Sequence, residues 1–187
     1  YDGKTWNNII LDNNDPARSI TTDKLGNIIV GSRGNFGFIS NNGYGEPIYK
    51  SLNKYLNDKN YKNRDIVYET FSLANGEIFF RTLNNLFFYK DKKIKIIKKF
   101  NKKKFGVSRY LNNEIFISII GESLAIINDH KIIKINYSEI FKDKTVTGFH
   151  KSKSNDLIVF TRKNGVYIQA EDGFYKIDNE IIDNIGV

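Results

Sequence analysis

Six polar side chains stand in or beside short loops that connect predicted β-strands, and they are the residues best suited to bind a ligand. Arginine presents five N–H donors to anions and hydroxyl groups, and asparagine offers both a donor and an acceptor. Loops displayed on a rigid framework commonly carry such binding groups. The six candidates are Arg33, Asn35, Arg81, Asn85, Glu122 and Arg162. We expect them to form a polar ring for a carbohydrate, an anion or a peptide; for each residue an ordinary solvated loop is the alternative.

Catalysis is not indicated by these residues. Glu122 is the only carboxylate among the loops that join second strands to third strands, whereas an enzyme needs convergent acids or a histidine–acid pair. His130 is expected in a solvent-exposed turn and His150 in a strand, without further ligands spaced for a metal. The absence of cysteine excludes thiolate catalysis and cysteine-bound zinc. Residues 12–15 are predicted to form a turn before Pro16. The sequence therefore predicts no catalytic residue, no metal site and no cofactor.

A run of lysines is the strongest local charge signal. Residues 90–104 contain nine lysines around Ile94 and Ile96, and the whole chain has a net charge of +8. One interpretation is a patch that binds a polyanion. The alternation of Lys93 and Lys95 with isoleucines favours an outermost strand whose lysines discourage edge-to-edge pairing. We therefore expect neither nucleic-acid binding nor membrane contact within this segment.

Composition limits the class of protein. The chain has 187 residues, of which 40% are hydrophobic and 14% aromatic, so it can bury a core and is not disordered. No apolar run is long enough to span a membrane, and the first residues do not resemble a signal peptide. Methionine is absent, and we expect the chain to be a piece of a longer protein.

An internal repeat predicts the architecture that positions the candidate residues. Four segments share one order of short strand, tight polar turn, apolar strand, polar loop, third strand and fourth strand. Their turn residues Gly26, Gly76, Asn113 and Asp156 are 50, 37 and 43 residues apart. Four strands at this spacing are typical of the blades of a β-propeller. Strands such as residues 115–120 are apolar on both faces, and stacked blades would cover both.

The predicted fold is therefore an all-β β-propeller with about four four-stranded antiparallel blades, forming part of a larger ring. We treat residues 1–187 as a single partial domain. Its segments are an outer strand of a preceding blade and a connection (1–16), four blades (17–66, 67–104, 105–145 and 146–178) and the start of another unit (179–187). A polar insertion at residues 51–65 is expected to contain one short helix or to be a surface loop.

The first repeat resembles the two-component regulator propeller family of bacterial sensors. Residues 17–20 read ARSI and residues 23–31 read DKLGNIIVG, similar to that family's VRSI-like strand, D-x-x-G-N turn, apolar strand and glycine. The chain departs from the family where Ile29-Val30-Gly31-Ser32 replaces Trp-Ile-Gly-Thr, and the third and fourth repeats lack the turn glycine. The shared motif is structural, so the resemblance implies a fold and no catalytic residue.

The resemblance also implies a location and a role. It suggests a periplasmic or otherwise extracytoplasmic sensor region in a signal-transduction regulator, whose full-length form could carry a histidine kinase. Our leading hypothesis is a non-catalytic segment that binds a carbohydrate or peptide ligand. The alternatives are a structural propeller that holds a partner protein in a secretion or surface assembly, and a propeller polysaccharide lyase or hydrolase.

Overall fold

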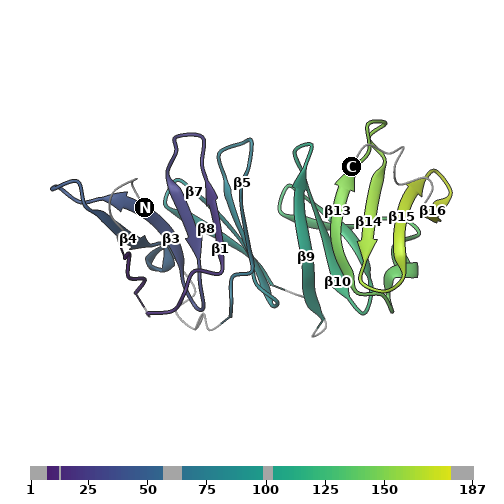
Figure 1. The fold of residues 1–187 in the computed structure, drawn as a ribbon, viewed down its shortest axis with the longest axis horizontal. Helices are drawn as coiled ribbons and strands as arrows, with labels where there is room; N and C mark the ends of the chain where they lie inside the picture. The colour runs from purple at the N-terminus through teal and green to yellow at the C-terminus, as the bar shows by residue number, and fades with distance from the viewer. Residues whose placement is uncertain (1–7, 13, 57–64, 99–102, 178–187) are drawn as a thin grey trace. The chain divides into compact units, whose positions relative to one another are not determined.

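A computed structural model describes residues 8–12, 14–56, 65–98 and 103–177 of the chain. Within these residues lie sixteen strands and two short 3₁₀ helices, η1 and η2. The strands form four antiparallel sheets of four strands each, and every sheet follows chain order from its first strand to its fourth (Figure 1). The sequence expectations for the first six residues and for residues 179–187 lie outside the described residues. No helix in the described part is long and apolar enough to cross a membrane.

The chain divides into two compact units, Tyr1–Ile96 and Ile97–Val187. The first unit holds two sheets, whose strands are coloured purple to teal in Figure 1. The first sheet consists of β1 (Ser19–Thr22), β2 (Ile28–Gly31), β3 (Phe36–Asn41) and β4 (Pro47–Ser51). The second consists of β5 (Glu69–Ser72), β6 (Ile78–Arg81), β7 (Asn85–Lys90) and β8 (Lys93–Lys98). The first strands β1 and β5 lie side by side.

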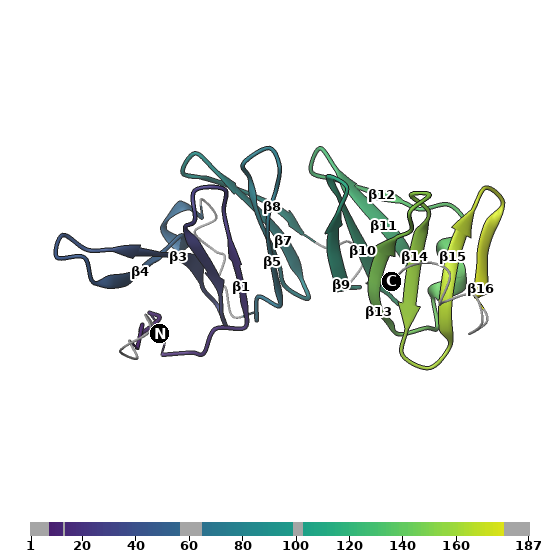
Figure 2. The same cartoon turned by 45° about the horizontal axis from the view of Figure 1, so that its top comes forward.

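The second unit repeats this plan with two further sheets, visible in green and yellow in Figure 2. The third sheet consists of β9 (Lys104–Leu111), β10 (Glu114–Ile120), β11 (Ser123–Asn128) and β12 (Lys131–Lys134). The fourth consists of β13 (Val146–Lys151), β14 (Leu157–Thr161), β15 (Gly165–Ala170) and β16 (Gly173–Ile177), with η2 (Ser138–Phe141) between the two sheets in sequence. Here too the first strands, β9 and β13, are in contact.

Positive backbone φ angles close the turn between the first and second strand of every sheet. Gly26 and Gly76 have φ of 80° and 82°, and Asn113 and Asn155 have φ of 67° and 69°. Glycine carries no Cβ penalty in this region, and asparagine tolerates it better than most residues. The predicted tight turns are thereby confirmed, and asparagine explains how the third and fourth repeats manage without the turn glycine.

The core of the first unit lies between its two sheets. Phe36 packs at a tilt against Phe80, with ring centroids 4.4 Å apart, and against Phe87 at 5.1 Å. The cluster also contains Ile29, Leu52, Val67 and Ile78. All four residues of β6 are buried, as expected for a strand that is apolar on both faces. Burying each large apolar side chain contributes about 1.5–3 kcal/mol, so sheet-on-sheet packing supplies most of the stability of this unit.

The second unit has an equivalent core. Phe116, Phe149 and Leu157 come from the third and fourth sheets and are each at most 5% exposed. Phe141 of η2 packs edge-on against Tyr167 at 5.2 Å between ring centroids. The helix η2 therefore fills part of the space between the two sheets, a contribution that the strand pattern of the sequence did not indicate.

The insertion at residues 51–65 contains one short helix, which is one of its two expected forms, but its first residues are not all at the surface. Ser51 still belongs to β4, and Leu52 is 3% exposed in the core of the first unit. The short helix η1 (Asn53–Tyr55) follows, and Tyr55 packs against the same core. Its start is attached to the core because Leu52 and Tyr55 are apolar or aromatic among many polar residues. Residues 57–64 lie outside the described residues.

The middle of the lysine run lies on an outermost strand, β8, as its alternation indicates. β8 is the last strand of the second sheet. Lys93 and Lys95 are exposed, whereas Ile94 and Ile96 pack against the core of the first unit. The pattern is thus explained by an edge strand with one covered face. Binding of a polyanion by this run stays a prediction.

Candidate functional site

Two loops of identical construction lie at one end of the first unit. In the loop from β2 to β3, the N–H of Ser32 donates to the carbonyl of Asn35 at 2.8 Å. In the loop from β6 to β7, the N–H of Thr82 donates to the carbonyl of Asn85 at 2.9 Å. The hydroxyls of Ser32 and Thr82 donate to the same two carbonyls. A serine or threonine that bonds its own loop in this way favours a fixed turn, so both loops are rigid.

Asp65 connects the two loops. Its carbonyl accepts a bond from the N–H of Gly34 at 2.8 Å, and its carboxylate accepts bonds from the amide of Asn84 at 2.8 and 2.9 Å. The same carboxylate lies 3.3 Å from the Thr82 hydroxyl and is an alternative acceptor for its single proton. Sequence reasoning missed Asp65 because it closes the insertion and belongs to no repeat motif. Its position directly before the first apolar residues of the second repeat was the one available signal.

Asn35 serves the scaffold. Its side chain is buried, and its amide oxygen accepts bonds from the hydroxyls of Tyr49 at 3.0 Å and Ser51 at 2.7 Å. Its amide nitrogen donates to the carboxylate of Asp12 at 3.1 Å. Burial, followed by the charge of Asp12, raises the pKa of the Tyr49 phenol well above its ordinary value, so the phenol remains a donor. Asn35 thereby ties β4 and the segment before β1 to the loop.

Arg81 is also engaged internally. Its Nε donates to the carboxylate of Glu69 at 2.7 Å, and the two side chains are only 6% and 13% exposed. The ring of Tyr68 lies 5.2 Å from the guanidinium carbon, a cation–π distance. Asn85, the other candidate from this loop, is buried, with its amide nitrogen 3.5 Å from Asp65. The structure thus gives Arg81 and Asn85 intramolecular partners; a ligand-binding role for either stays a prediction.

Arg33 is the candidate of the first unit that faces solvent. Its side chain is 54% exposed, and its Nε lies 4.0 Å from a carboxylate oxygen of Asp15. Its backbone forms a bridge with Ile66, immediately after Asp65. Tyr68, two residues further along, is 42% exposed. The loop end therefore presents a guanidinium and a phenol on a backbone fixed by hydrogen bonds, a set that can bind hydroxyl, carboxylate or carbonyl groups.

The candidates of the second unit lie in shorter turns. Gly121, with φ of 76°, and Glu122 join β10 to β11. The Glu122 carboxylate pairs with the ammonium of Lys103 at 3.1 Å. Arg162 is exposed and its N–H donates to the carbonyl of Thr145 at 2.9 Å. Both side chains are partly exposed, at 40% and 42%, and a partly exposed ion pair contributes little to stability.

The two histidines offer no centre for chemistry. His130 lies in the turn before β12, as expected, but its side chain is only 19% exposed, so the expectation of a solvent-exposed residue was wrong. The positive φ of 58° at His130 places the residue in a tight hairpin. His150 is half-buried in β13. Across the described ranges, no three histidine, aspartate or glutamate side chains gather into a possible metal site.

Comparison with known proteins shows the fold. No family model and no curated protein matches the sequence, so membership of the two-component regulator propeller family stays a prediction. Solved structures do match. An extracellular domain assigned to a one-component system of Bacteroides thetaiotaomicron is 13% identical with a TM-score of 0.66, over 94% of this chain and 23% of that one. A second, assigned to a hybrid two-component system of the same organism, is 18% identical with a TM-score of 0.63, over 90% and 23%.

An enzyme has the same fold. Virginiamycin B lyase from Staphylococcus aureus is 16% identical with a TM-score of 0.59, over 86% of this chain and 55% of the lyase. The chain therefore spans about half the length of the lyase and about a quarter of the two extracellular domains. The all-β propeller fold with four four-stranded antiparallel blades is confirmed. Because both enzymes and extracellular domains of regulators share it, the fold alone does not identify an activity.

Proposed function

We propose that this chain is a non-catalytic, ligand-binding segment of an extracytoplasmic sensor propeller in a bacterial signal-transduction regulator. Its similarity in fold to extracellular domains assigned to one-component and two-component systems supports the sensor role. The observation that carries the proposal is the Asp65 network, which joins the loops of two neighbouring blades. Loops held in this way are preorganised, and preorganisation lowers the entropic cost of binding a ligand.

The ligand we propose is a carbohydrate or a peptide that contacts Arg33 and Tyr68. The guanidinium donates to carboxylate, carbonyl or hydroxyl oxygens, and the phenol ring packs against the apolar face of a sugar or a side chain. Asp65 gives such binding a route to the scaffold, because the same residue touches the loops of the first and second blades. A ligand that draws these loops together would stiffen the contact between the two blades.

A panel of oligosaccharides and short peptides, screened by thermal shift on the full chain, tests this proposal. A ligand that binds only the folded state raises the melting temperature by mass action. The Arg33→Ala variant should weaken binding of that ligand about tenfold or more, because charged hydrogen bonds contribute about 1.5–3 kcal/mol. Arg109→Ala, which removes an exposed arginine from β9, is the matched control and should bind as the parent does.

Three results would contradict the proposal. A ligand whose affinity is the same for the parent and Arg33→Ala would bind elsewhere. Turnover of a ligand by the purified chain, followed by chromatography of the products, would make the segment an enzyme like the lyase that shares its fold. Silence across the panel with stable co-purification of a partner protein would favour the assembly role.

A further inference from the structure

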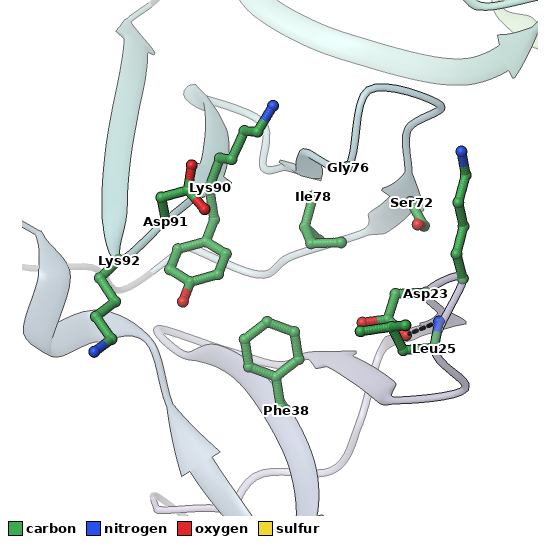
Figure 3. Close-up of a pocket in the computed structure, with 11 residues that line it drawn as sticks. Asp23, Leu25, Phe38, Ser72, Gly76, Ile78, Lys90, Asp91 and Lys92 are labelled. Carbon is green, nitrogen blue, oxygen red and sulfur yellow. Dashed lines mark hydrogen bonds between the residues drawn. The ribbon is translucent and has the colours of Figure 1, made fainter.

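A pocket lies in the first unit at the end of the strands opposite to the Asp65 network. It is an open pocket of about 510 Å³, lined by parts of both sheets (Figure 3). The turn from β1 to β2, the turn from β5 to β6 and the turn from β7 to β8 surround it. Small-molecule sites commonly have volumes of about 300–1,000 Å³. The pocket is therefore large enough for a small organic ligand, and no residue of the loop-end site contributes to it.

The floor of the pocket is apolar and aromatic. Phe38 of β3 and Ile78 of β6 approach from opposite sheets, as Figure 3 shows. Tyr89 of β7 meets Phe38 edge-on, with ring centroids 5.6 Å apart. Leu25, at 87% exposure, adds an apolar edge at the mouth. Aromatic rings prefer offset or edge-to-face neighbours at centroid separations of about 4.5–7 Å, and a flat ring placed on this floor would find such neighbours.

The phenol of Tyr89 stays protonated at neutral pH. Burial, together with the nearby Tyr55 and Asp91, raises its pKa above the ordinary value. Ser72 supplies a second hydroxyl to the lining. The floor thus contributes hydrogen-bond donors without a negative charge of its own.

Three lysines surround the mouth. The ammonium of Lys24 donates to the carbonyl of Ala74 at 2.8 Å, and that of Lys90 donates to the carbonyl of Asn75 at 2.9 Å. These bonds hold both cations beside the turn from β5 to β6. Lys92 extends from the facing turn at the other side of the pocket. An ammonium has three N–H donors, so each bond to a carbonyl leaves donors for a ligand.

The two carboxylates of the lining cancel only part of this charge. Asp23 accepts bonds within its own turn from the N–H groups of Leu25 and Asn27, at 2.9 and 2.8 Å, and from the Asn27 amide. Its oxygens are therefore occupied by the scaffold. Asp91 is the second acid of the lining, so two negative charges stand beside the three positive charges of Lys24, Lys90 and Lys92. The lining has a formal charge of +1, with the cations distributed around the opening, and this favours an anionic ligand.

We infer that this pocket binds an aromatic carboxylate. The ring would lie on Phe38, Ile78 and Tyr89, and the carboxylate would meet the ammonium groups at the mouth. Lysine at the rim suits a carboxylate joined to the ring by a short linker. An ammonium acts as a point charge and does not impose the fixed fork geometry of a guanidinium. A sugar acid lacks the planar apolar face that this floor fits. The site is separate from the loop end and goes beyond the proposed function.

Isothermal titration of the full chain with indole-3-acetate tests the inference. Binding should weaken as salt is raised, because exposed charges are screened. The Lys90→Gln/Lys92→Gln variant should bind at least about tenfold more weakly, since a charged hydrogen bond changes affinity by roughly 10- to 100-fold. Lys151→Gln is the matched control, because Lys151 also donates to a turn carbonyl, that of Asn155, but in the second unit. It should leave binding unchanged.

Two further ligands separate charge from shape. Indole-3-acetamide has the same ring without the charge and should bind at least about tenfold more weakly. Glucuronate has a carboxylate without the aromatic ring and should give no measurable heat. Absence of binding by indole-3-acetate, equal affinity for acid and amide, or an unchanged affinity in Lys90→Gln/Lys92→Gln would each overturn the inference. Arg33→Ala should bind indole-3-acetate normally, so failure at the pocket and failure at the loop end are distinguishable.

Discussion

Replacing Gly31 by alanine tests the close approach of the first two blades. A Cβ at this position would lie 2.4 Å from Cγ1 of Val67 and 2.5 Å from Oγ of Ser19, far inside the roughly 3.5–4.0 Å of a favourable contact. Val67 cannot withdraw easily, because it is buried and its N–H donates to the carbonyl of Ser32 at 3.0 Å. Inserting a methyl group into such a site costs about 1–3 kcal/mol. We expect Gly31→Ala to lower the free energy of unfolding by that amount.

Urea denaturation followed by circular dichroism measures the change. Each kcal/mol should also lower the melting temperature by about 2–4 °C for a chain of this size. Gly43→Ala is the matched control, because a Cβ at Gly43 meets nothing within 4 Å. Its free energy of unfolding should stay within about 0.5 kcal/mol of the parent.

A double-mutant cycle locates the clash. Val67→Ala alone should destabilise by leaving a cavity, whereas the new methyl group of Gly31→Ala should partly occupy that cavity in the double variant. We expect a favourable coupling of about 0.5–3 kcal/mol between the two changes. Additive effects would show that Val67 is not the obstacle. A Gly31→Ala variant as stable as the parent would refute the close packing of the first and second sheets.

Two further predictions concern buried and local charges. Glu69→Leu removes the carboxylate to which the Nε of buried Arg81 donates and should lower the free energy of unfolding by about 3–5 kcal/mol, measured by guanidinium denaturation. Glu69→Leu/Arg81→Leu should recover most of the loss; equal stability of the two variants would contradict this. At Asp23, burial raises the carboxyl pKa, but hydrogen bonds within its own turn together lower it by more, so the folded-state pKa is below the ordinary value. Its contribution to stability is present above the pKa of the unfolded chain and is lost as pH falls through the lower folded pKa. Denaturation at a series of pH values should therefore show a smaller acid-side loss for Asp23→Ala; an identical loss would count against the turn bonds.

The architecture could be predicted because its determinants are local. A positive φ at Gly26 or Asn155 is a property of a few bonded atoms, and the sequence displays the residues that tolerate it. The same holds for alternation along β8, where Lys93 and Lys95 face solvent and isoleucines face the core. Repetition then multiplies each local signal four times, which is why the order of strands in all four sheets follows from the sequence.

Whether a polar residue serves the scaffold or a ligand depends on partners that are distant in the sequence. Asn35 looks available in the sequence, yet its amide is bonded to Asp12, Tyr49 and Ser51, between 14 and 23 residues away. Arg81 is likewise paired with Glu69 across neighbouring strands. Type and loop position identify groups that can bind a ligand, but only the folded partners reveal whether the scaffold already uses them. Buried polar groups must be hydrogen-bonded, so the same composition suits a scaffold and a binding site.

The two ends of the sheets in the first unit differ for a physical reason. At the turn end each hairpin is closed by its own residues, as Asp23 closes the turn from β1 to β2. At the loop end the link between blades must be built from outside the hairpins, and Asp65 supplies it from the connecting segment. A substitution at Asp23 therefore alters one hairpin, whereas one at Asp65, or at Lys24, which donates to the carbonyl of Ala74 in the second blade, alters a contact between two blades. If ligand binding at the loop end is transmitted from blade to blade, Asp65 is one residue through which the first unit can transmit it. A ligand in the turn pocket would act instead through Phe38 and Ile78, which form its floor from the two sheets.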